Sequence, residues 1–183
     1  LVELFSQLGF RTWLREAEGG TPAGDAAAPA AVPPAPTFSG TPDRSGYETI
    51  LTTAQLEAWL QRIEQAQLTS LDTETTDLDP MQARLVGISF CIVPGAAAYL
   101  PLGHVYAGAP DQLPLGDALE TLKPWLESPQ HRKVGQHLKY DRHVFANHGI
   151  RLAGIVDDTL LESYVLESDQ PHELGSLAAR HCG

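Results

Sequence analysis

The densest group of chemically capable side chains is the segment SLDTETTDLD at residues 70–79, which holds four carboxylates within eight positions. Asp72 and Glu74 stand two residues apart, directly after an apolar run that is typical of a strand. Because residues i and i+2 share one face of a strand, both carboxylates would point to the same side. Such a pair suits one hard cation, since Mg²⁺ prefers carboxylate and water oxygens and keeps part of its hydration shell for phosphate. The alternative is an acidic loop that is simply solvated.

A second group lies in GQHLKYDRHVFANHG, whose composition favours a helix. Several polar side chains and one valine would fall within about a third of the helix circumference. They are His137, Tyr140, Asp141, Val144 and His148. The opposite side offers Leu138 and Phe145 to a core, and Asp141 would face a cleft, with Lys139 and Arg142 flanking it for phosphate. The alternative is an ordinary surface helix that carries a basic face and one stray acid.

The charge of the chain is uneven. Its formal net charge is −11, which by itself weighs against a nucleic-acid binder, because phosphate contact favours Lys and Arg. From Tyr47 onward there are nine Lys and Arg residues, and five of them fall within residues 132–151, a window whose single acid is Asp141. A basic surface that carries one carboxylate is therefore more informative than the total.

Several common site types are missing from the sequence. It contains no G-x-S-x-G nucleophile elbow, no Walker loop and no dinucleotide-binding glycine fingerprint. Cys91 and Cys182 lie far apart with no C-x-x-C, which argues against a disulfide framework and a cysteine zinc site. The histidines lack ligand spacing, and His104 and His131 are interpreted as surface or structural residues. Without a membrane-length apolar run or a signal peptide, we expect a cytoplasmic protein with no membrane partner.

Composition divides the chain into three segments. Residues 1–16 carry apolar groups at roughly helical spacing but are too short to fold alone. Residues 17–46 are rich in Ala, Pro and Gly and predict a flexible linker. The globular part begins near Tyr47 and comprises residues 47–183.

Within the globular part, apolar patterning and turn-forming residues predict alternating elements. Strands are expected at residues 47–51, 68–75, 83–93, 96–102, 132–136 and 154–158. Helices are expected at residues 52–66, 115–128, 138–149, 159–168 and from 174 onward. The predicted helix boundaries are Thr52 or Thr53 as the first cap, Gly149 as the end of the third helix, and Asp157 or Asp158 as the cap of the fourth. A hairpin followed by alternating helices and strands implies an α/β domain with a mixed sheet.

Three stretches match a known family in their residues and in their order along the chain. LDTETTDL, VGQHLKYDR and DDTLLESYVL resemble the 3′–5′ proofreading exonuclease domain of bacterial DNA polymerase I, the family A polymerase of replication and repair. The resemblance covers residues 47–183. Upstream, ELFSQLGFRTWL is similar to the end of that family's 5′-nuclease region, which the Ala/Pro-rich linker would join to the exonuclease domain. Ribonuclease D-type enzymes share the acid pattern but lack this N-terminal context.

The resemblance implies a ribonuclease H-like fold, in which helices flank a mixed five-stranded sheet that is incomplete at its C-terminus. It also implies an exonuclease that uses four acids and two metal ions, Mg²⁺ by preference, with Mn²⁺ or Zn²⁺ as alternatives. One metal orients the attacking water, and the other stabilises the departing 3′ oxygen. Asp72 and Glu74 match the first motif, with Asp72 bridging the metals. Asp141 matches the second motif, whose acid acts on the second metal largely through water.

The resemblance further implies how a substrate would lie. The expected partners are the 3′ end of single-stranded DNA and the polymerase domain of a longer parent chain. Leu78 matches a position that wedges against the terminal base, and Thr73 would contact the terminal nucleotide through its backbone. Gln136 and Tyr140 match positions near the single-stranded 3′ end. His137 stands where the family usually has Asn, and both side chains form hydrogen bonds.

The third motif of the family, a Tyr followed four residues later by an Asp, has no counterpart here. Tyr164 is followed at that spacing by Ser168, and Asp169 lies one residue too far. The sequence ends in SLAARHCG, before the motif is expected, which implies a fragment. We therefore expect weak metal binding, poor or no DNA cleavage, and an exposed apolar patch near Tyr164 that promotes self-association. The competing interpretation is a non-catalytic remnant that contacts DNA or has a purely structural purpose.

Overall fold

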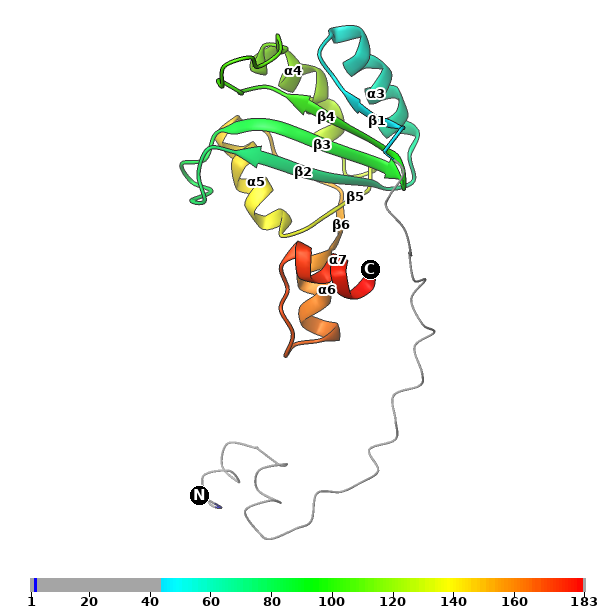
Figure 1. Cartoon of the computed structure of the whole chain (residues 1–183), viewed down its shortest axis with the longest axis vertical. Helices are drawn as coiled ribbons and strands as arrows, with labels where there is room; N and C mark the ends of the chain where they lie inside the picture. Colours follow the sequence, from blue (N-terminus) through cyan, green and yellow to red (C-terminus); the bar gives the residue numbers. More distant parts are fainter. Residues whose placement is uncertain (1, 3–43, 183) are drawn as a thin grey trace. The chain divides into compact units, whose positions relative to one another are not determined.

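A single mixed sheet organises the described part of the chain, with helices on both of its faces (Figure 1). The structure, a computed structural model, describes residue 2 and residues 44–182. The predictions for residues 1–16, and for nearly all of residues 17–46, lie outside the described residues. In the described part, no helix is both long and apolar enough to cross a bilayer.

The sheet combines a central antiparallel meander with parallel edge strands. Its strands are β1 (Tyr47–Thr49), β2 (Thr69–Thr75), β3 (Leu85–Val93), β4 (Ala96–Pro101), β5 (Lys133–Gly135) and β6 (Ile155–Asp158). They lie in the order β1-β4-β3-β2-β5-β6. Antiparallel pairing joins β2, β3 and β4, while β1 pairs with β4, and β5 with β2 and β6, in parallel. The predicted α/β class and the six strands predicted from residue patterning are confirmed, so the sheet has one strand more than the five that the family resemblance implied.

The helices begin and end close to where the sequence predicts. They are α3 (Thr53–Gln65), α4 (Leu115–Leu126), α5 (Leu138–Asn147), α6 (Thr159–Leu166) and α7 (Leu174–His181). Thr52 caps α3 in a capping box with Gln55, and Asp158 caps α6 by accepting a hydrogen bond from the Leu160 amide. Gly149 adopts a φ of 71° just after α5, the left-handed conformation that ends helices. These local signals are confirmed.

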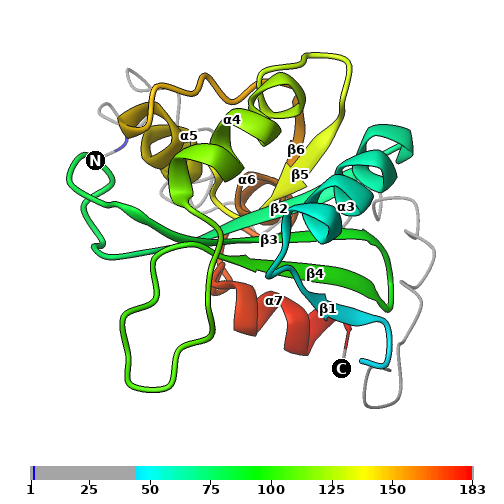
Figure 2. The same ribbon diagram turned by 90° about the horizontal axis from the view of Figure 1, so that it is seen from above.

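The position of α5 follows from the unequal lengths of neighbouring strands. β5 pairs only with Thr69 and Ser70 of β2, although β2 continues to Thr75. Seen from above, α3 and α4 cover the sheet, and α5 lies beside it at the end that β5 and β6 leave uncovered (Figure 2). Figure 1 shows α6 and α7 on the other side of the sheet from α3 and α4. The edge of β2 beyond Ser70 is therefore available to side chains from α5.

The main hydrophobic core joins the inner sheet face to α3, α4 and α5. Trp59, Trp125, Phe90 and Phe145 are its largest apolar side chains, each at most 2% exposed. Phe90 and Trp125 meet edge to face, with ring centroids 6.0 Å apart. Burial of each such side chain stabilises the fold by roughly 1.5–3 kcal/mol, so this core fixes the faces that β2 and α5 turn outward.

Candidate active site

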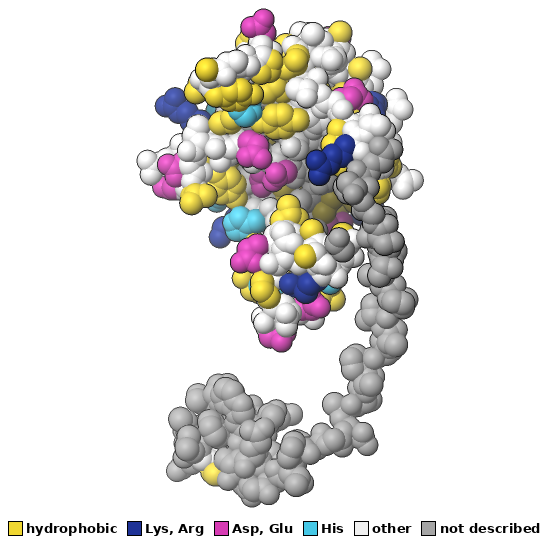
Figure 3. All heavy atoms as spheres, viewed as in Figure 1, with side chains coloured by type: hydrophobic (Ala, Val, Ile, Leu, Met, Phe, Trp, Pro, Cys, Tyr) yellow, Lys and Arg dark blue, Asp and Glu magenta, His cyan; other side chains and the backbone are white. Residues whose placement is uncertain are grey.

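The strand β2 presents carboxylates on one face and core residues on the other. Leu71 is fully buried, while Asp72 and Glu74 are exposed on the opposite face, as alternation along a strand requires. Asp72 pairs with Ser89 of β3, and Glu74 pairs with Gly87. Acidic side chains lie in the middle of the molecular face drawn in Figure 3, and Lys and Arg side chains stand farther out. The predicted arrangement of the two acids on one side of a strand is confirmed.

The third predicted acid reaches the same strand from α5. Asp141 is only 3% exposed, and its Oδ1 accepts a hydrogen bond of 2.6 Å from the Thr73 hydroxyl. Thr73 stands between Asp72 and Glu74 in the sequence, so its side chain leaves the strand toward the other face. Asp141 thus contacts β2 at the edge that β5 does not cover, rather than facing an open cleft as the sequence suggested. The same hydrogen bond places the two predicted acid motifs side by side.

Other members of the predicted polar arc on α5 do not face a cleft either. Val144 is fully buried in the core, and the Nε2 atom of His148 accepts a hydrogen bond of 3.2 Å from the Leu85 amide of β3. Leu138 and Phe145 are buried, as predicted. The helical wheel was right about the core residues and too wide in its polar arc, because α5 also packs sideways against the strands.

A loop that follows β2 is fastened to α5 at both of its ends. The Tyr140 hydroxyl forms hydrogen bonds with the Thr75 hydroxyl and with the Asp77 carbonyl. At the other end, Asn147 Nδ2 donates to the carbonyls of Pro80 at 2.8 Å and Ala83 at 3.0 Å. Between these ties, Leu78 is 94% exposed. The loop therefore holds a large apolar side chain in solvent, close in sequence to the acids of β2.

The carboxylates carry uncompensated negative charge. Burial raises the pKa of Asp141 to about 6, and the charge of Asp72 adds to that rise, whereas the hydrogen bond from Thr73 opposes it. Partial burial also raises the pKa of Asp72, and the neighbouring Glu74 carboxylate raises it further. Among the described residues, no Lys or Arg forms an ion pair with any of the three acids. A cation placed here would relieve both effects.

The donor set fits a divalent cation in an open arrangement. Asp72 and Glu74 supply two carboxylates on one face, and Mg²⁺ is often held by one or two carboxylates with waters and phosphate completing its shell. Within residues 44–182, no three His, Cys, Asp or Glu side chains converge closely enough to enclose a metal ion. Asp141 remains turned toward the Thr73 hydroxyl. The residues thus suit partial coordination of a cation by Asp72 and Glu74, while Asp141 stays hydrogen-bonded to Thr73.

A tyrosine that the sequence analysis overlooked also belongs to this face. The phenol of Tyr99 lies over Gly87, where any side chain would collide with it. Burial raises the pKa of Tyr99, and the charge of Glu74 raises it further. The Tyr99 hydroxyl forms a hydrogen bond of 2.6 Å with His104 Nε2. His104 is therefore structural, as interpreted. The cross-strand partner of Glu74 being a glycine was the available signal for a large neighbour on the next strand.

Asp158 fixes the start of α5 as well as the start of α6. Its two carboxylate oxygens accept hydrogen bonds from the amides of His137 at 3.0 Å, Leu138 at 2.9 Å and Leu160 at 3.0 Å. His137 has φ 63°, a left-handed conformation in which Asn, Asp and His are the most common residues after Gly. The replacement of the family's usual Asn by His is thus compatible with the backbone. The capping of α6 was predicted, whereas the hold on α5 was not.

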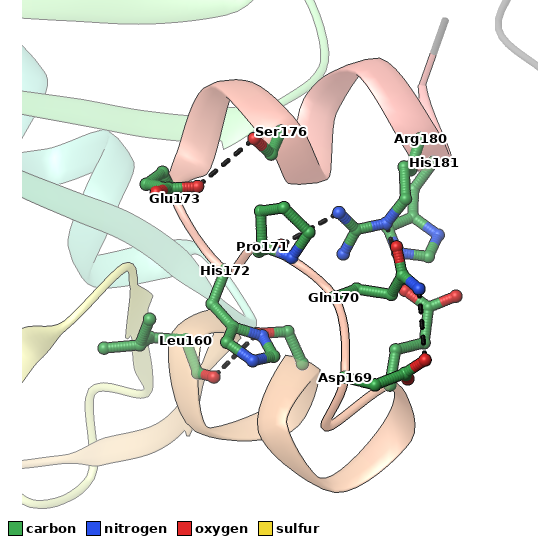
Figure 4. Close-up of polar contacts among 11 residues, drawn as sticks. Leu160, Asp169, Gln170, Pro171, His172, Glu173, Ser176, Arg180 and His181 are labelled. Atoms are coloured by element: carbon green, nitrogen blue, oxygen red, sulfur yellow. Dashed lines mark hydrogen bonds and ion pairs between the residues drawn. The ribbon is translucent and has the colours of Figure 1, made fainter.

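The side chain of Gln136 contributes to the attachment of α6 and α7. Its Nε2 donates to the His172 carbonyl at 2.8 Å, and its Oε1 accepts from the Thr159 hydroxyl. Between the two helices, Ser163 is bonded to His172, whose ring stacks on Tyr164 with centroids 3.6 Å apart. The Ser163 hydroxyl also donates to the Leu160 carbonyl, and Arg180 donates to the Pro171 carbonyl at 2.8 Å (Figure 4). Gln136 therefore holds this helical pair instead of facing the acids.

The surface of α6 is apolar, as expected near Tyr164. Its exposed side chains include Leu161, Tyr164, Val165 and Leu166, and Val165 is 86% exposed. Ser168 and Asp169 follow in the turn toward α7, where Asp169 accepts a hydrogen bond from the neighbouring Gln170. The apolar patch is confirmed, while self-association through it stays a prediction.

The five basic residues of the 132–151 window do not share one surface. Lys133 is fully buried, donates to the His131 carbonyl at 2.8 Å, and lies 4.2 Å from the centroid of the Trp125 ring. Burial lowers its pKa to about 8. Three of the five, Lys139, Arg142 and Arg151, help to line one groove on the outer side of α5. The predicted basic surface is therefore smaller and lies away from the acids.

Comparison with known proteins places this architecture among nucleases. A family model described as 3′-5′ exonuclease matches residues 47–183. DNA polymerase I of Pseudomonas aeruginosa is 42% identical over 190 aligned residues, which cover 100% of this chain and 20% of that protein. The chain thus spans about a fifth of that relative's length.

Solved structures share the fold at low sequence identity. The POL domain of Pol1 from M. smegmatis, in complex with DNA primer-template and dNTP, has a TM-score of 0.59 at 22% identity, covering 72% of this chain and 22% of that chain. Brucella melitensis NrnC with bound Mg²⁺ has a TM-score of 0.50 at 16% identity, covering 73% of this chain and 59% of that chain. At these identities, the structural likeness speaks for the fold alone.

Proposed function

The chain belongs to the 3′–5′ exonuclease family of DNA polymerase I, and we propose that it contributes metal-dependent removal of 3′-terminal nucleotides from single-stranded DNA. The physiological task would be proofreading during replication and repair, in the cytoplasm, within a longer chain that also carries a polymerase domain. The whole-chain similarity to a bacterial DNA polymerase I supports this context. The ribonuclease H-like exonuclease fold supports the chemistry.

The acids of β2 would hold the metal. Asp72 and Glu74, which share one face of β2, would present two carboxylates to one cation, and Asp141 would act on a second through water. When bound, Mg²⁺ or Mn²⁺ would activate a water molecule and neutralise charge on the phosphate, with Zn²⁺ as a further alternative. Thr73 holds Asp141 in place by its hydroxyl. At neutral pH the carboxyl of Asp141, with a pKa of about 6, is largely ionised and available.

The substrate would approach from the loop that follows β2. Leu78 is exposed and apolar, so it suits a wedge against the terminal base. Tyr140 and His137 begin α5 beside this loop and would line the path of the strand, and the Thr73 backbone would meet the terminal nucleotide. Gln136 would contact the DNA strand only if its hydrogen bond to the His172 carbonyl were broken.

The observation that carries the proposal is the 2.6 Å hydrogen bond from Thr73 to Asp141. It brings Asp141 of α5 against β2 on the Thr73 side, while Asp72 and Glu74 stand on the opposite side of the same strand. None of the three acids forms an ion pair with a Lys or Arg of the described residues. A purely structural surface would give no reason to gather three carboxylates around one strand, because mutual repulsion is destabilising.

The test follows a 5′-labelled single-stranded oligonucleotide with the chain in Mg²⁺, and then in Mn²⁺. We expect slow, stepwise shortening from the 3′ end, which Asp72→Ala abolishes. The matched control is Asp111→Ala, an exposed acid on the loop between β4 and α4, outside β2 and α5, which should leave the shortening unchanged. A parallel metal titration, read as the shift in melting temperature, reports cation binding without catalysis. Shortening that persists in Asp72→Ala would contradict the assignment.

A second candidate is a non-catalytic member of the family that contacts DNA or only supports neighbouring domains. One observation favours it: within residues 44–182, no three His, Cys, Asp or Glu side chains converge closely enough to enclose a metal ion. A folded chain that binds neither Mg²⁺ nor Mn²⁺ and leaves the oligonucleotide intact would select this alternative.

A further inference from the structure

A basic groove lies on the outer side of α5. Its volume is about 630 Å³, and it is lined by α5 residues at positions i, i+3, i+4 and i+7 together with the segment that follows Gly149. The charged or titratable side chains at its rim are Lys139, Arg142, His143 and Arg151. Each of them is exposed. The groove is therefore open to a large ligand.

The groove is separate from the carboxylate site. At about 100° per residue, Lys139, Arg142 and His143 centre on the side of α5 nearly opposite to Asp141. Asp141 is buried against Thr73 of β2, and the groove residues contact neither of them. A single nucleotide could not occupy both places, because a helix with its side chains is about 10–12 Å thick.

None of the groove's Lys and Arg side chains forms an ion pair within residues 44–182, whereas Arg62, Lys123 and Arg180 do. Glu127 is an acidic neighbour of Arg151. It accepts a hydrogen bond of 2.9 Å from the Arg151 amide, and this bond and the charges of Lys123 and Arg151 lower its pKa, but its ion pair is with Lys123. On a chain whose net charge is −11, Lys139 and Arg142 therefore form a local excess of positive charge that favours an anionic ligand.

We propose that this groove binds the phosphate backbone of the nucleic-acid strand some nucleotides upstream of the 3′ end held near Asp72. This inference rests on the proposed function for the direction of the strand. Lys139 and Arg142 lie about 4.5 Å apart along the helix axis, which is close to the spacing of charges along a nucleic-acid strand, about 3.4 Å in a duplex. Their flexible side chains can therefore reach neighbouring phosphates. The groove floor, formed by Ala146, Ile150 and Leu152, offers no polar side chain that would read a base or enclose a small anion.

The geometry makes oligonucleotide length the decisive variable. A strand that passes α5 must bridge about 10–12 Å. At the duplex spacing of about 3.4 Å this corresponds to roughly three nucleotides beyond the terminal one, and an extended single strand needs fewer. A dinucleotide occupies the terminal site and falls short of the groove. A 20-mer spans both, so only its binding includes the groove cations.

The experiment measures fluorescence anisotropy of labelled dT2 and dT20 with the full chain, in the Asp72→Ala background so that no DNA is consumed. The variant is Lys139→Glu/Arg142→Glu. The control, Arg44→Glu/Arg84→Glu, changes net charge equally at exposed arginines outside the groove. We expect the groove variant to lose at least about tenfold in affinity for dT20, and its salt slope to shrink by about 1.4, since each contact contributes about 0.7. Affinity for dT2 should change little.

Each other outcome overturns the inference. Equal loss in both double variants would mean that only total charge matters, and equal loss for dT2 would place these cations in the terminal site. Competition by poly-glutamate as strong as by unlabelled dT20 would identify a site for acidic proteins. No binding of dT20 by the parent would also refute it. Because the experiment measures binding and not shortening, it still tests the groove even if the exonuclease proposal fails.

Discussion

The two sides of α5 differ in charge, in burial and in what they contact. The inner side carries Leu138, Asp141 and Phe145, all buried, and its one acid is bonded to β2. The outer side carries Lys139 and Arg142, both exposed and without ion pairs among the described residues. One short helix thus separates the proposed metal site from the proposed phosphate-binding groove. A surface that is acidic in total can therefore serve a polyanion, provided that the two charges are kept on different sides.

The largest expected loss of stability follows from removing the core contact that fixes which side of α5 faces inward and which faces outward. Phe145→Ala deletes a fully buried aromatic side chain that fixes the rotation of α5, and it should lower the free energy of unfolding by about 3–5 kcal/mol. Urea denaturation measures this. The control on the outer side, Arg142→Ala, should stay within about 0.5 kcal/mol. A loss below about 1 kcal/mol for Phe145→Ala would mean that α5 is not held by its core face.

A smaller loss should follow removal of the carboxylate that starts α5. Asp158→Ala leaves the amides of His137, Leu138 and Leu160 without their acceptor, so we expect a loss of about 2–3 kcal/mol in unfolding free energy. Asp158→Asn keeps one acceptor oxygen and should lose about half as much. Hydrogen exchange should accelerate at the His137 and Leu138 amides in both variants. Unchanged exchange at these amides would show that Asp158 caps α6 only.

A change on the inner side should have the opposite sign. The pKa of Asp141 is about 6 in the folded chain, above its unfolded value near 3.9, so the folded state binds more protons between these two values. Its contribution therefore destabilises the fold increasingly as pH rises from about 4 to about 6. Without metal, Asp141→Asn should raise unfolding free energy at pH 8 by about 1–2 kcal/mol and show little gain at pH 4.

The measurement for Asp141→Asn is urea denaturation in chelator at both pH values, with the exposed Asp111→Asn as control. The same substitution should weaken any stabilisation by Mg²⁺, so the acid would favour function at the expense of stability. A gain that is equal at pH 4 and pH 8 would contradict the assigned pKa.

The smallest expected loss of stability concerns the loop that follows β2 and is hydrogen-bonded to α5. Tyr140→Phe removes the hydroxyl that contacts Thr75 and the Asp77 carbonyl, and it should lower unfolding free energy by about 1 kcal/mol. Limited proteolysis should then cut the loop around Leu78 faster. Tyr106→Phe, at an exposed tyrosine elsewhere, is the matched control. Equal proteolysis in both variants would show that the loop does not depend on α5.

The sequence by itself determined the features that depend on near neighbours. Alternation along residues 69–75 predicted that Asp72 and Glu74 share a face, and helical spacing predicted that Leu138 and Phe145 are buried. Cap residues predicted the helix ends at Thr52, Gly149 and Asp158. Motif wording predicted the family, which the family model and the polymerase relative confirm. All of these signals act over a few residues, where backbone geometry alone fixes side-chain direction.

Only the tertiary structure decided which distant groups meet. Thr73 and Asp141 lie 68 positions apart, and they meet because β5 ends early and leaves the edge of β2 to α5. The same kind of contact buried Lys133, which charge counting had assigned to a surface, and engaged Gln136 with the His172 carbonyl. Strand lengths and edge coverage arise from the whole sheet, so no local pattern records them. They separate the acids from the basic groove because the sheet, rather than the helix, fixes how α5 is turned.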